Sequence, residues 1–517
     1  MGPSVTTTTL VTPSFEDDPV LGDCARFVRL GYPHAIERKN MQTEKYNKKK
    51  ENNKKKKSSK FKPTSAYKSG VLVNPDAAGI DIHPTNIFIA VPPDRDTTVV
   101  RKFETFTQDL LEAVIWLKKC KVRTIAMEST GVYWIPLYQL LEDHGFEVYL
   151  VNARYVKNVP GRKTDVGDAQ WLQYLHSVGL LRGSFRPAQE ICALRSISRH
   201  RESLLQMGSV HIQHMQKALD QMNLHLHHVI SDITGVTGLA IIEAILNGER
   251  DRNKLAEHRN PRIKCSEEII IKSLEGDYRR EHLFVLQQSL DSWKYVHKQI
   301  DECDAELECL TRQRPLLSNN PPVIFAHNRR KKISKNQPRG CWQELLANQF
   351  GTDLTAVPGI QTATVQVLFT ELGSDWSCFP TASHFCSWLN LCPTNELSNG
   401  KVVRHRKLRT HKRLRVALRL AAFSLHHNKS PLGDEFRRRK SKLGPTGAIT
   451  AMAHKLARIL WHLVTFKTPY DESIFSQAAQ IHKKALQKKL IKRIESMGYI
   501  VSPSPGMAPP VALAPVQ

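Results

Sequence analysis

The chain has 517 residues, 41% of them hydrophobic, which is enough for roughly two to four domains with packed cores and excludes a wholly disordered polypeptide. Lys and Arg number 75 against 49 Asp and Glu, so the formal net charge at pH 7 is +26. Such a charge favours polyanionic partners, and nucleic acid is the first candidate.

The first segment, residues 1–75, is rich in lysine. Its run "EKYNKKKENNKKKKSSKFK" carries ten lysines and almost no apolar side chains. A segment of this kind cannot bury a core, so the sequence predicts a disordered basic segment. It is either a solubilising tail or a nonspecific nucleic-acid arm.

Residues 76–188 alternate between strands and helices. The stretches "AAGIDIHP" and "NIFIAVPP" predict a hairpin, "TVVRKFETF" predicts a third strand, and "TQDLLEAVIWLKKC" predicts a helix with an apolar stripe. A strand in "RTIAMES", a helix in "VYWIPLYQLLEDHG", a strand in "EVYLVN" and a helix from about residue 165 follow. Three strands followed by α-β-α-β-α is the element order of an α/β RNase H-like (RuvC-like) catalytic domain.

Four carboxylates fall where RNase H-like sites carry their acids. Asp81 lies in the first strand, Glu128 ends the fourth, and Asp165 and Asp168 share one face of the last helix. Carboxylates pressed together repel one another unless a cation neutralises them, and their hard oxygen atoms suit Mg²⁺. One or two such ions can hold a phosphodiester, so the sequence predicts a catalytic metal site acting on phosphate.

Each of these acids also has a structural interpretation. Asp165 and Asp168 complement a helix dipole, Asp81 can be a satisfied turn acid, and Glu128 can cap the next helix. An actin-like sugar kinase or ATPase also opens with an aspartate in its first hairpin, but it needs glycines there, and this turn reads "HPTN". The stretch "PGRKTD" lacks the spacing of a P-loop.

The middle region, residues 189–312, is predicted to be helical. In "LFVLQQSLDSWKYVHKQIDECDAELECL" the apolar positions are spaced by threes and fours, as in a coiled-coil seam, which predicts a dimerising or spacing helix. A homo-oligomer, dimer or tetramer, is therefore expected.

The histidines of "HIQHMQKALDQMNLHLHHVI" are interpreted as surface or core residues and not as metal ligands. Residues 313–349 are predicted to be a basic linker.

A small, mainly α-helical domain is predicted over residues 350–470, before a basic, Pro-rich tail over 471–517. The stretch "LTAVPGIQTATVQVLFTELG" has the pattern of a helix-hairpin-helix segment, in which backbone N–H groups near Gly359 can hold a phosphate; an ordinary helical turn is the alternative. Ser398 sits in a glycine-bearing loop, where a turn residue is the simplest interpretation. Nine Lys or Arg fall within 401–419, with no acid between Lys401 and Gly433. The candidate nucleic-acid contacts are Arg162, Lys163, Gly359, Lys401, Arg404, Arg406, Lys407, Arg409, Lys412 and Arg413.

The spacing of the cysteines and the lengths of the apolar runs indicate where in the cell the protein is expected. The ten cysteines include no Cys-x-x-Cys pair, so neither a zinc knuckle nor a disulfide framework is predicted. The first thirty residues lack the apolar core of a signal peptide, and the most apolar run, "GLAIIEAIL", is interrupted by Glu243. We expect a cytoplasmic protein with no membrane segment.

Three long stretches carry a family resemblance: "GIDIHPTNIFIAV", "MESTGVYWIPLYQLLEDHGFEVYLVNARYVKNVPGRKTDVGDAQWLQYLHSVGLLRGSFRP" and "SHFCSWLNLCPTNELSNGKVV". Over residues 76–470 the chain resembles the DEDD transposases of bacterial insertion sequences, the IS110 family and especially its IS1111 branch. The resemblance implies an RNase H-like domain, a coiled-coil middle and a C-terminal transposase domain that supplies a serine nucleophile. Mapped by motif, the metal-binding residues are Asp81, Glu128, Asp165 and Asp168, and the nucleophile is Ser398.

The resemblance also implies partners and a mechanism. Members of this family are recombinases guided by a structured RNA, so double-stranded DNA, a guide RNA and Mg²⁺ are expected, in the cytoplasm of a bacterium and on its nucleoid when bound to DNA. The family usually has a glycine after the serine, whereas this chain has Asn399, which tolerates the left-handed conformation. The alternatives are a metal-dependent nuclease for branched DNA, in which water attacks, and a non-enzymatic helix-hairpin-helix DNA-binding protein.

Overall fold

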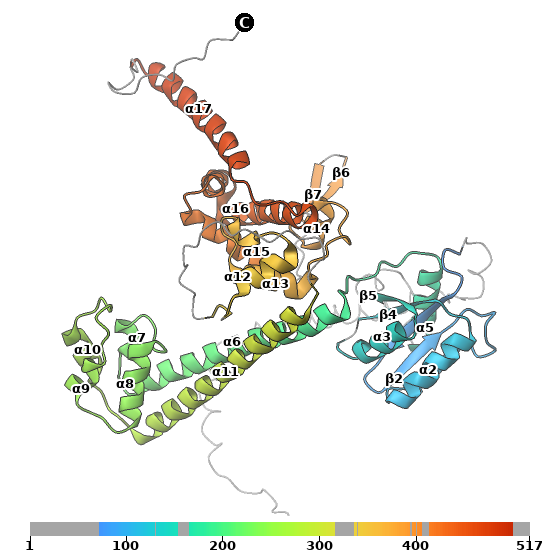
Figure 1. Cartoon of the computed structure of the whole chain (residues 1–517), viewed down its shortest axis with the longest axis horizontal. Coiled ribbons are helices and arrows are strands. Elements are labelled where there is room, and N and C mark those ends of the chain that lie inside the picture. The colour runs from blue at the N-terminus through green and yellow to red at the C-terminus, as the bar shows by residue number, and fades with distance from the viewer. Residues whose placement is uncertain are drawn as a thin grey trace, which may run out of the picture. The chain divides into compact units, whose positions relative to one another are not determined.

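A computed structural model describes residues 72–499, except 130, 153–164, 316–335, 339, 393–394, 400 and 406–412 (Figure 1). The Lys-rich run, most of the expected linker and the Pro-rich end therefore lie outside the described residues. The chain divides into two units, residues 1–185 and residues 186–517.

All eight elements predicted for the first unit are present. The strands are β1 (Ala77–Ile82), β2 (Asn86–Ala90), β3 (Val100–Glu104), β4 (Thr124–Glu128) and β5 (Glu147–Val151), and the helices are α2 (Thr107–Lys119), α3 (Trp134–Asp143) and α5 (Asp165–Ser177). They form one sheet with the order β3-β2-β1-β4-β5, in which β1–β2 and β2–β3 are antiparallel and β1–β4 and β4–β5 are parallel. This unit is an α/β domain built on a mixed sheet.

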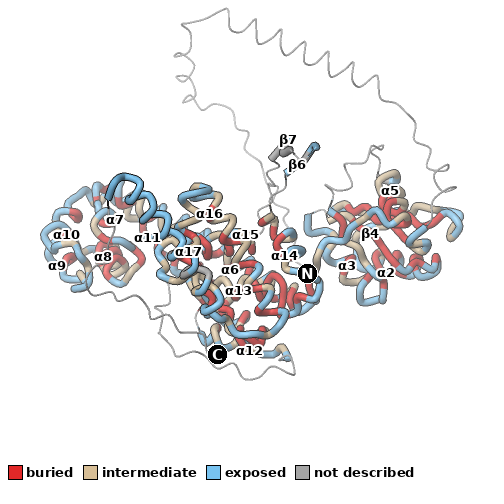
Figure 2. The backbone as a smooth tube through the Cα atoms, turned by 90° about the horizontal axis from the view of Figure 1, so that it is seen from above, coloured by how far each residue is buried: buried red, intermediate tan, exposed pale blue. Residues whose placement is uncertain are grey.

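Strand β1 is buried along its whole length. Helices cover both faces of the sheet, with α5 on one side of β4 and α2 and α3 on the other (Figure 2). Ala78, Ile80 and Ile82 belong to the core cluster that also contains side chains of α2 and α3. Successive side chains of a strand point to opposite faces, so the residues between them face the other layer. That layer is α5, whose Gln173 donates a hydrogen bond to the Ala77 carbonyl at 3.1 Å.

Gly79 sets how closely α5 approaches the sheet. A Cβ atom at this position would lie 2.2 Å from the backbone nitrogen of Gln173 and 2.4 Å from the carbonyl oxygen of Ala169. Real Cβ atoms do not approach backbone atoms this closely, so β1 and α5 are in direct backbone contact here. The glycine thereby fixes the height of α5, which carries Asp168, above the strand that carries Asp81.

We expect Gly79→Ala to destabilise the first unit, because the added methyl group has to push α5 off the sheet. Overpacking of this kind costs about 1–3 kcal/mol or more. Calorimetric unfolding of the full chain should show one transition shifted down by several degrees. Gly208→Ala is the control, because its new Cβ would meet only ordinary contacts at 3.5 Å or more; an equal shift in both variants would contradict the proposed contact.

The second unit begins with a long helical hairpin. Helix α6 (Gln189–Gln221) packs along α11 (Arg280–Gln313), and the tip between them holds α7 (Leu226–Val229), α8 (Val236–Leu246), α9 (Arg252–Glu257) and α10 (Glu267–Ser273). The apolar seam expected in α11 is buried within the chain, for instance by packing of Val296 and Ile300 against Leu204 of α6. The intramolecular partner α6 therefore accounts for the seam without a second copy.

A buried ion pair joins the two long helices. Arg201 of α6 donates two hydrogen bonds to Asp304 of α11, at 2.6 and 2.9 Å, and both side chains are buried. Removing one partner of such a pair is strongly destabilising, because the other charge is left unpaired in the interior. The pair therefore helps to fix the register of the hairpin.

The rest of the second unit is mostly helical. Its elements are α12 (Trp342–Phe350), η3 (Leu354–Ala356), α13 (Thr362–Leu372), α14 (Ala382–Trp388), β6 (Asn395–Ser398), β7 (Lys401–His405), α15 (Arg413–Ser424), η4 (Leu425–His427), α16 (Pro431–Phe466) and α17 (Ser473–Glu495). Helix α16 is broken at Gly444, which has a φ of 72° and precedes Pro445. The tail expected from residue 471 thus contains a helix of 23 residues.

The helix-hairpin-helix pattern is met only in part. Before the turn, the chain forms the short 3₁₀ helix η3 instead of an α-helix, because Asp353 accepts hydrogen bonds from the backbone and side chain of Thr355, and Pro358 disfavours helical backbone at Val357.

The nine cysteines among the described residues are free thiols, as predicted. Within the described part of the chain, no helix has the length and apolar character needed to cross a bilayer.

Candidate functional site

Asp81 and Glu128 lie on the same face of the sheet. In β4, Ile125 and Met127 belong to the core beneath α2 and α3, so Glu128 faces the opposite layer. Strands β1 and β4 are paired in parallel with Ile80 opposite Met127, and each acid is the next residue along its strand. The register therefore brings the two carboxylates next to each other at the ends of adjacent strands.

Asp168 joins them from α5. The pKa of Asp81 is raised mainly because the carboxyl group is buried, and the negative charges of Asp168 and Glu128 raise it further, against the lowering effect of His83. The three acids are thus close enough to interact electrostatically. Asp165 begins α5, but its side chain lies outside the described residues.

His83 is a site residue that the sequence reasoning missed. Its Nε2 atom lies 3.2 Å from Oδ2 of Asp81, and its backbone N–H donates to the carbonyl of Asn86 at 2.9 Å. The available signal was the spacing of two residues along one extended segment, which places Asp81 and His83 on the same face. The site therefore contains an imidazole ring beside the buried carboxylate of Asp81.

The donor set suits a hard cation. Asp81, Glu128 and Asp168 offer carboxylate oxygens. Burial, and then the charges of Asp168 and Glu128, raise the pKa of Asp81, and a bound cation would favour the charged form of this carboxylate. Among the described residues, only Asp220, His227 and His228 have ligand atoms that all lie within 4.8 Å of one another, so the three carboxylates are spaced more widely than that.

The histidine-rich stretch brings a carboxylate close to two of its histidines, a proximity that its sequence did not indicate. Asp220 ends up beside two of its histidines, with its Oδ1 atom 3.6 Å from Nε2 of His227 and 3.9 Å from Nε2 of His228. Sequence spacing did not reveal this group because Asp220 belongs to α6, whereas the histidines follow the turn at Asn223, whose φ is 56°. Both Asp220 and His228 are largely exposed, at 47% and 62% of their side-chain area.

Ser398 lies at the tip of a two-stranded hairpin. It pairs with Lys401 across the turn, which leaves a two-residue connection made of Asn399 and Gly400. Asn-Gly is the preferred sequence for the type I′ turn of such hairpins, and Asn399 has the expected left-handed conformation, with a φ of 49°. Ser398 is exposed, so its hydroxyl group is accessible to a ligand.

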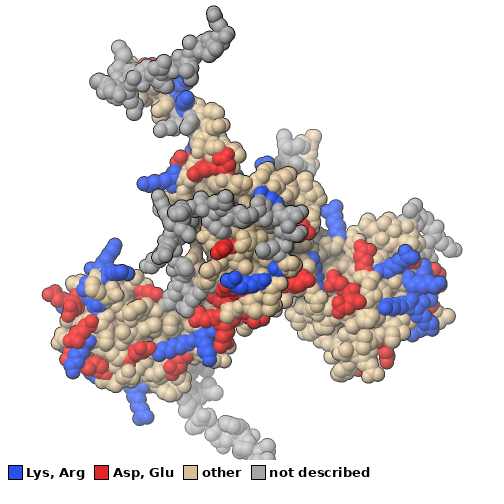
Figure 3. Space-filling view, in the orientation of Figure 1, with Lys and Arg blue, Asp and Glu red and all other residues tan. Residues whose placement is uncertain are grey.

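Most of the predicted nucleic-acid contacts lie outside the described residues, and the two that do not, Gly359 and Arg413, have structural roles. Arg162, Lys163, Arg406, Lys407, Arg409 and Lys412 lie outside the described residues, as do the side chains of Lys401 and Arg404. Gly359 has a structural reason to be glycine: its φ is 88°, and a Cβ atom would lie 2.7 Å from the carbonyl of Ala421. Figure 3 shows Lys and Arg gathered on one side of the α/β unit, whereas the tip of the α6–α11 hairpin mixes both signs.

Arg413 forms ion pairs inside the second unit. Its guanidinium group contacts Glu202 of α6 and lies 3.1 Å from Glu371 of α13. The buried Glu371 also accepts two hydrogen bonds from Arg199, at 3.0 and 2.8 Å. Arg413 therefore joins α15 to α6 and α13, a role that the run of basic residues around it did not indicate.

His176 is buried where α5 meets β4, and we expect it to make the first unit sensitive to acid. Its Nε2 atom lies 2.8 Å from Oγ1 of Thr124, and burial lowers the pKa of His176 from 6.5 to about 4. Between these values the unfolded chain binds the proton first, so stability is complete above about pH 6.5 and falls as the pH drops toward 4, by about 3 kcal/mol in total.

Calorimetry of the full chain between pH 7 and pH 5 tests this expectation, with the transition of the first unit identified by its shift in Gly79→Ala. His176→Gln should reduce the pH dependence of that transition, because the variant has no proton to take up. Identical pH dependence in wild type and variant would contradict the assignment.

The comparison with protein-family models gives two matches. Residues 78–224 match the model DEDD_Tnp_IS110, described as a transposase. Residues 352–437 match the model described as the transposase IS116/IS110/IS902 family. The first match includes Asp81, Glu128, Asp165 and Asp168, and the second includes Ser398. A search of the curated proteins finds no match.

Proposed function

Because the chain belongs to the IS110 family of transposases, we propose that it cuts and rejoins DNA strands with the carboxylates of its α/β unit and with Ser398. The observation that carries the proposal is the convergence of Asp81, Glu128 and Asp168 on one face of the sheet, together with an exposed serine on a hairpin tip in the second matched region.

The α/β unit acts as an RNase H-like catalytic domain in this proposal. The mixed sheet order β3-β2-β1-β4-β5, with Asp81 on its central strand and Glu128 on the neighbouring one, supports this. Asp81, Glu128, Asp168 and, from the family resemblance, Asp165 would hold Mg²⁺. When bound, the ion neutralises the carboxylates and stabilises negative charge on the scissile phosphate.

Ser398 is the proposed nucleophile. Its Oγ atom attacks phosphorus, so that an Oγ–P bond forms while the bond to the leaving strand oxygen breaks; the serine gives up its proton, and the leaving oxygen takes one up. A hydroxyl group of the recipient strand then attacks the phosphoserine and releases the serine. One ester is exchanged for another at each step, so no external energy source is needed.

The partners follow from the family and the charge. Double-stranded DNA is the substrate, and a structured guide RNA is proposed by resemblance. A homo-oligomer, dimer or tetramer, is proposed because two cleaved strands have to be exchanged, and its contacts have to lie outside the α11 seam that α6 covers. The proposed place of action is the bacterial cytoplasm.

Denaturing electrophoresis tests the proposal. End-labelled DNA carrying the ends of the element is incubated with the full chain, its guide RNA and Mg²⁺. We expect a slowly migrating band that protease treatment removes. Cleaved DNA without this band would favour a nuclease in which water attacks, and binding without cleavage would favour a DNA-binding protein without catalysis.

A further inference from the structure

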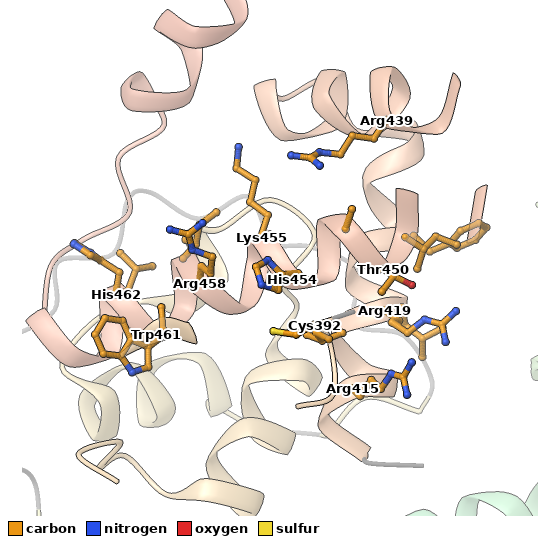
Figure 4. Close-up of a pocket in the computed structure, with 18 of the residues that line it drawn as sticks. Cys392, Arg415, Arg419, Arg439, Thr450, His454, Lys455, Arg458, Trp461 and His462 are labelled. Carbon is orange, nitrogen blue, oxygen red and sulfur yellow. The ribbon is translucent and has the colours of Figure 1, made fainter. Parts of the chain in front are cut away.

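A large pocket opens in the second unit, lined by α14, α15, α16 and the start of α17 (Figure 4). Its volume is about 1800 Å³. Pockets for single small molecules usually enclose about 300–1,000 Å³, so this one suits an extended ligand. Two of its lining residues, Arg415 and Arg419, belong to the basic run over residues 401–419.

The pocket carries unbalanced positive charge. Glu435 balances the charge of two basic side chains only in part, because its single carboxylate accepts hydrogen bonds from Arg439 at 2.9 and 2.7 Å and also contacts Lys455. Within the part of the chain that the structure describes, Arg415 and Arg419 have no carboxylate partner, and the buried Nε atom of each has no hydrogen-bond partner. The pocket is therefore prepared for an anionic ligand.

Much of its remaining lining is apolar or aromatic, beside polar residues that include Arg458 and Asp471. On α15, Val416, Leu420 and Phe423 are spaced as one helix face and are 46%, 64% and 57% exposed. Figure 4 shows Trp461 and His462 of α16 at the opposite end from Arg415 and Arg419. The indole of Trp461 is held in place by a hydrogen bond to the carbonyl of Phe379 at 2.9 Å.

The pocket adjoins the serine hairpin. Its lining includes Leu391, Cys392 and Asn395, and Asn395 is the first residue of β6, the strand that ends at Ser398. A ligand in the pocket therefore lies beside the strand that carries the proposed nucleophile.

We propose that this pocket binds a short single-stranded stretch of nucleic acid, with phosphates at Arg415 and Arg419 and unstacked bases against Phe423 and the other aromatic side chains. Positive groups that follow the backbone, combined with aromatic side chains that stack on bases, are the means by which proteins hold single strands. An apolar peptide would leave the arginines without an anion. The inference deepens the proposed function, since the strand it would hold is one next to the cut.

Fluorescence anisotropy tests the pocket without catalysis. The probes are labelled oligodeoxythymidylate and oligouridylate, and the full chain is kept in EDTA. We expect Arg415→Gln/Arg419→Gln to bind the preferred probe at least tenfold more weakly and to lower the slope of log K against log salt by about 1.4, the value for two lost phosphate contacts on a single strand. Arg438→Gln/Lys442→Gln removes the same charge from α16 outside the pocket and should change the affinity less than threefold.

Phe423→Ala separates stacking from charge. It should weaken binding about tenfold with an unchanged salt slope, whereas Phe284→Ala, which removes a similarly exposed aromatic ring from α11, outside the pocket, should not. Preference for either probe supports the proposal and identifies the strand as DNA or RNA. Equal binding by the pocket and control variants, or failure of the wild type to bind either probe, would overturn it.

The outcome is independent of the chemistry at Ser398. If wild type forms no covalent adduct but the pocket variants still lose the probe, the proposed nucleophile is wrong and the pocket stands. If the adduct forms and the pocket variants bind normally, the pocket proposal alone is wrong.

Discussion

Ser398→Ala should eliminate the covalent protein–DNA adduct and all recombination, while DNA affinity stays within about twofold of wild type. The alanine has no oxygen atom to bond to phosphorus, so the first ester exchange cannot occur. Folding should be unaffected, because Ser398 is exposed at a hairpin tip and the turn is specified by Asn399 and Gly400. Electrophoresis of labelled DNA after reaction with Mg²⁺ measures the adduct, and gel shift measures affinity.

Two further variants complete this test. Ser441→Ala removes an exposed hydroxyl group on α16 and should leave the adduct at its wild-type level. Ser398→Cys should retain at most a trace of activity, because a thiolate is nucleophilic but larger. An adduct formed by Ser398→Ala at the wild-type rate would reduce Ser398 to a turn residue.

Asp81→Asn and Asp168→Asn should each reduce DNA cleavage by about a thousandfold or more. An amide keeps the size of the side chain but loses the negative charge and one of the oxygen ligands, and stabilisation of phosphate by a bound metal contributes several kcal/mol to such reactions. DNA binding should be nearly unchanged, since the basic surfaces remain. Single-turnover cleavage across a range of Mg²⁺ concentrations measures both the rate and the apparent metal affinity.

The matched control is Asp143→Asn, which neutralises an exposed acid at the end of α3. It should cleave like wild type. If either site variant keeps the wild-type rate at every Mg²⁺ concentration, that residue does not belong to the metal site, and the electrostatic interaction among the three acids is only structural.

The α/β unit could be predicted from sequence because its signals are local. Alternation in β1 and β4 indicates which side chains share a face, and this is enough to bring Asp81 and Glu128 together once the strand order is known. The left-handed conformation of Asn399 was predictable for the same reason, since Asn tolerates it more readily than most residues.

What the sequence could not supply was the partner across each contact. Periodicity in α11 indicates a buried face but not that α6 of the same chain covers it. A basic run indicates charge but not that Arg413 meets Glu371 from a segment 42 residues away. Asp220 and His227 likewise come together only through the turn at Asn223, and the pocket exists only where four helices meet.

The break in helix α16 affects how the walls of that pocket are held. The break at Gly444 divides the helix into two helical segments, with Arg439 on the first and Lys455 on the second. Glu435 lies on the first segment, where it accepts hydrogen bonds from Arg439, and it also forms an ion pair with Lys455 on the second segment. The ion pair therefore links the two segments across the break. Both parts of α16 line the pocket, so this ion pair across the break constrains how two of its walls are placed, and a Cβ atom at position 444 would meet no atom within 4 Å.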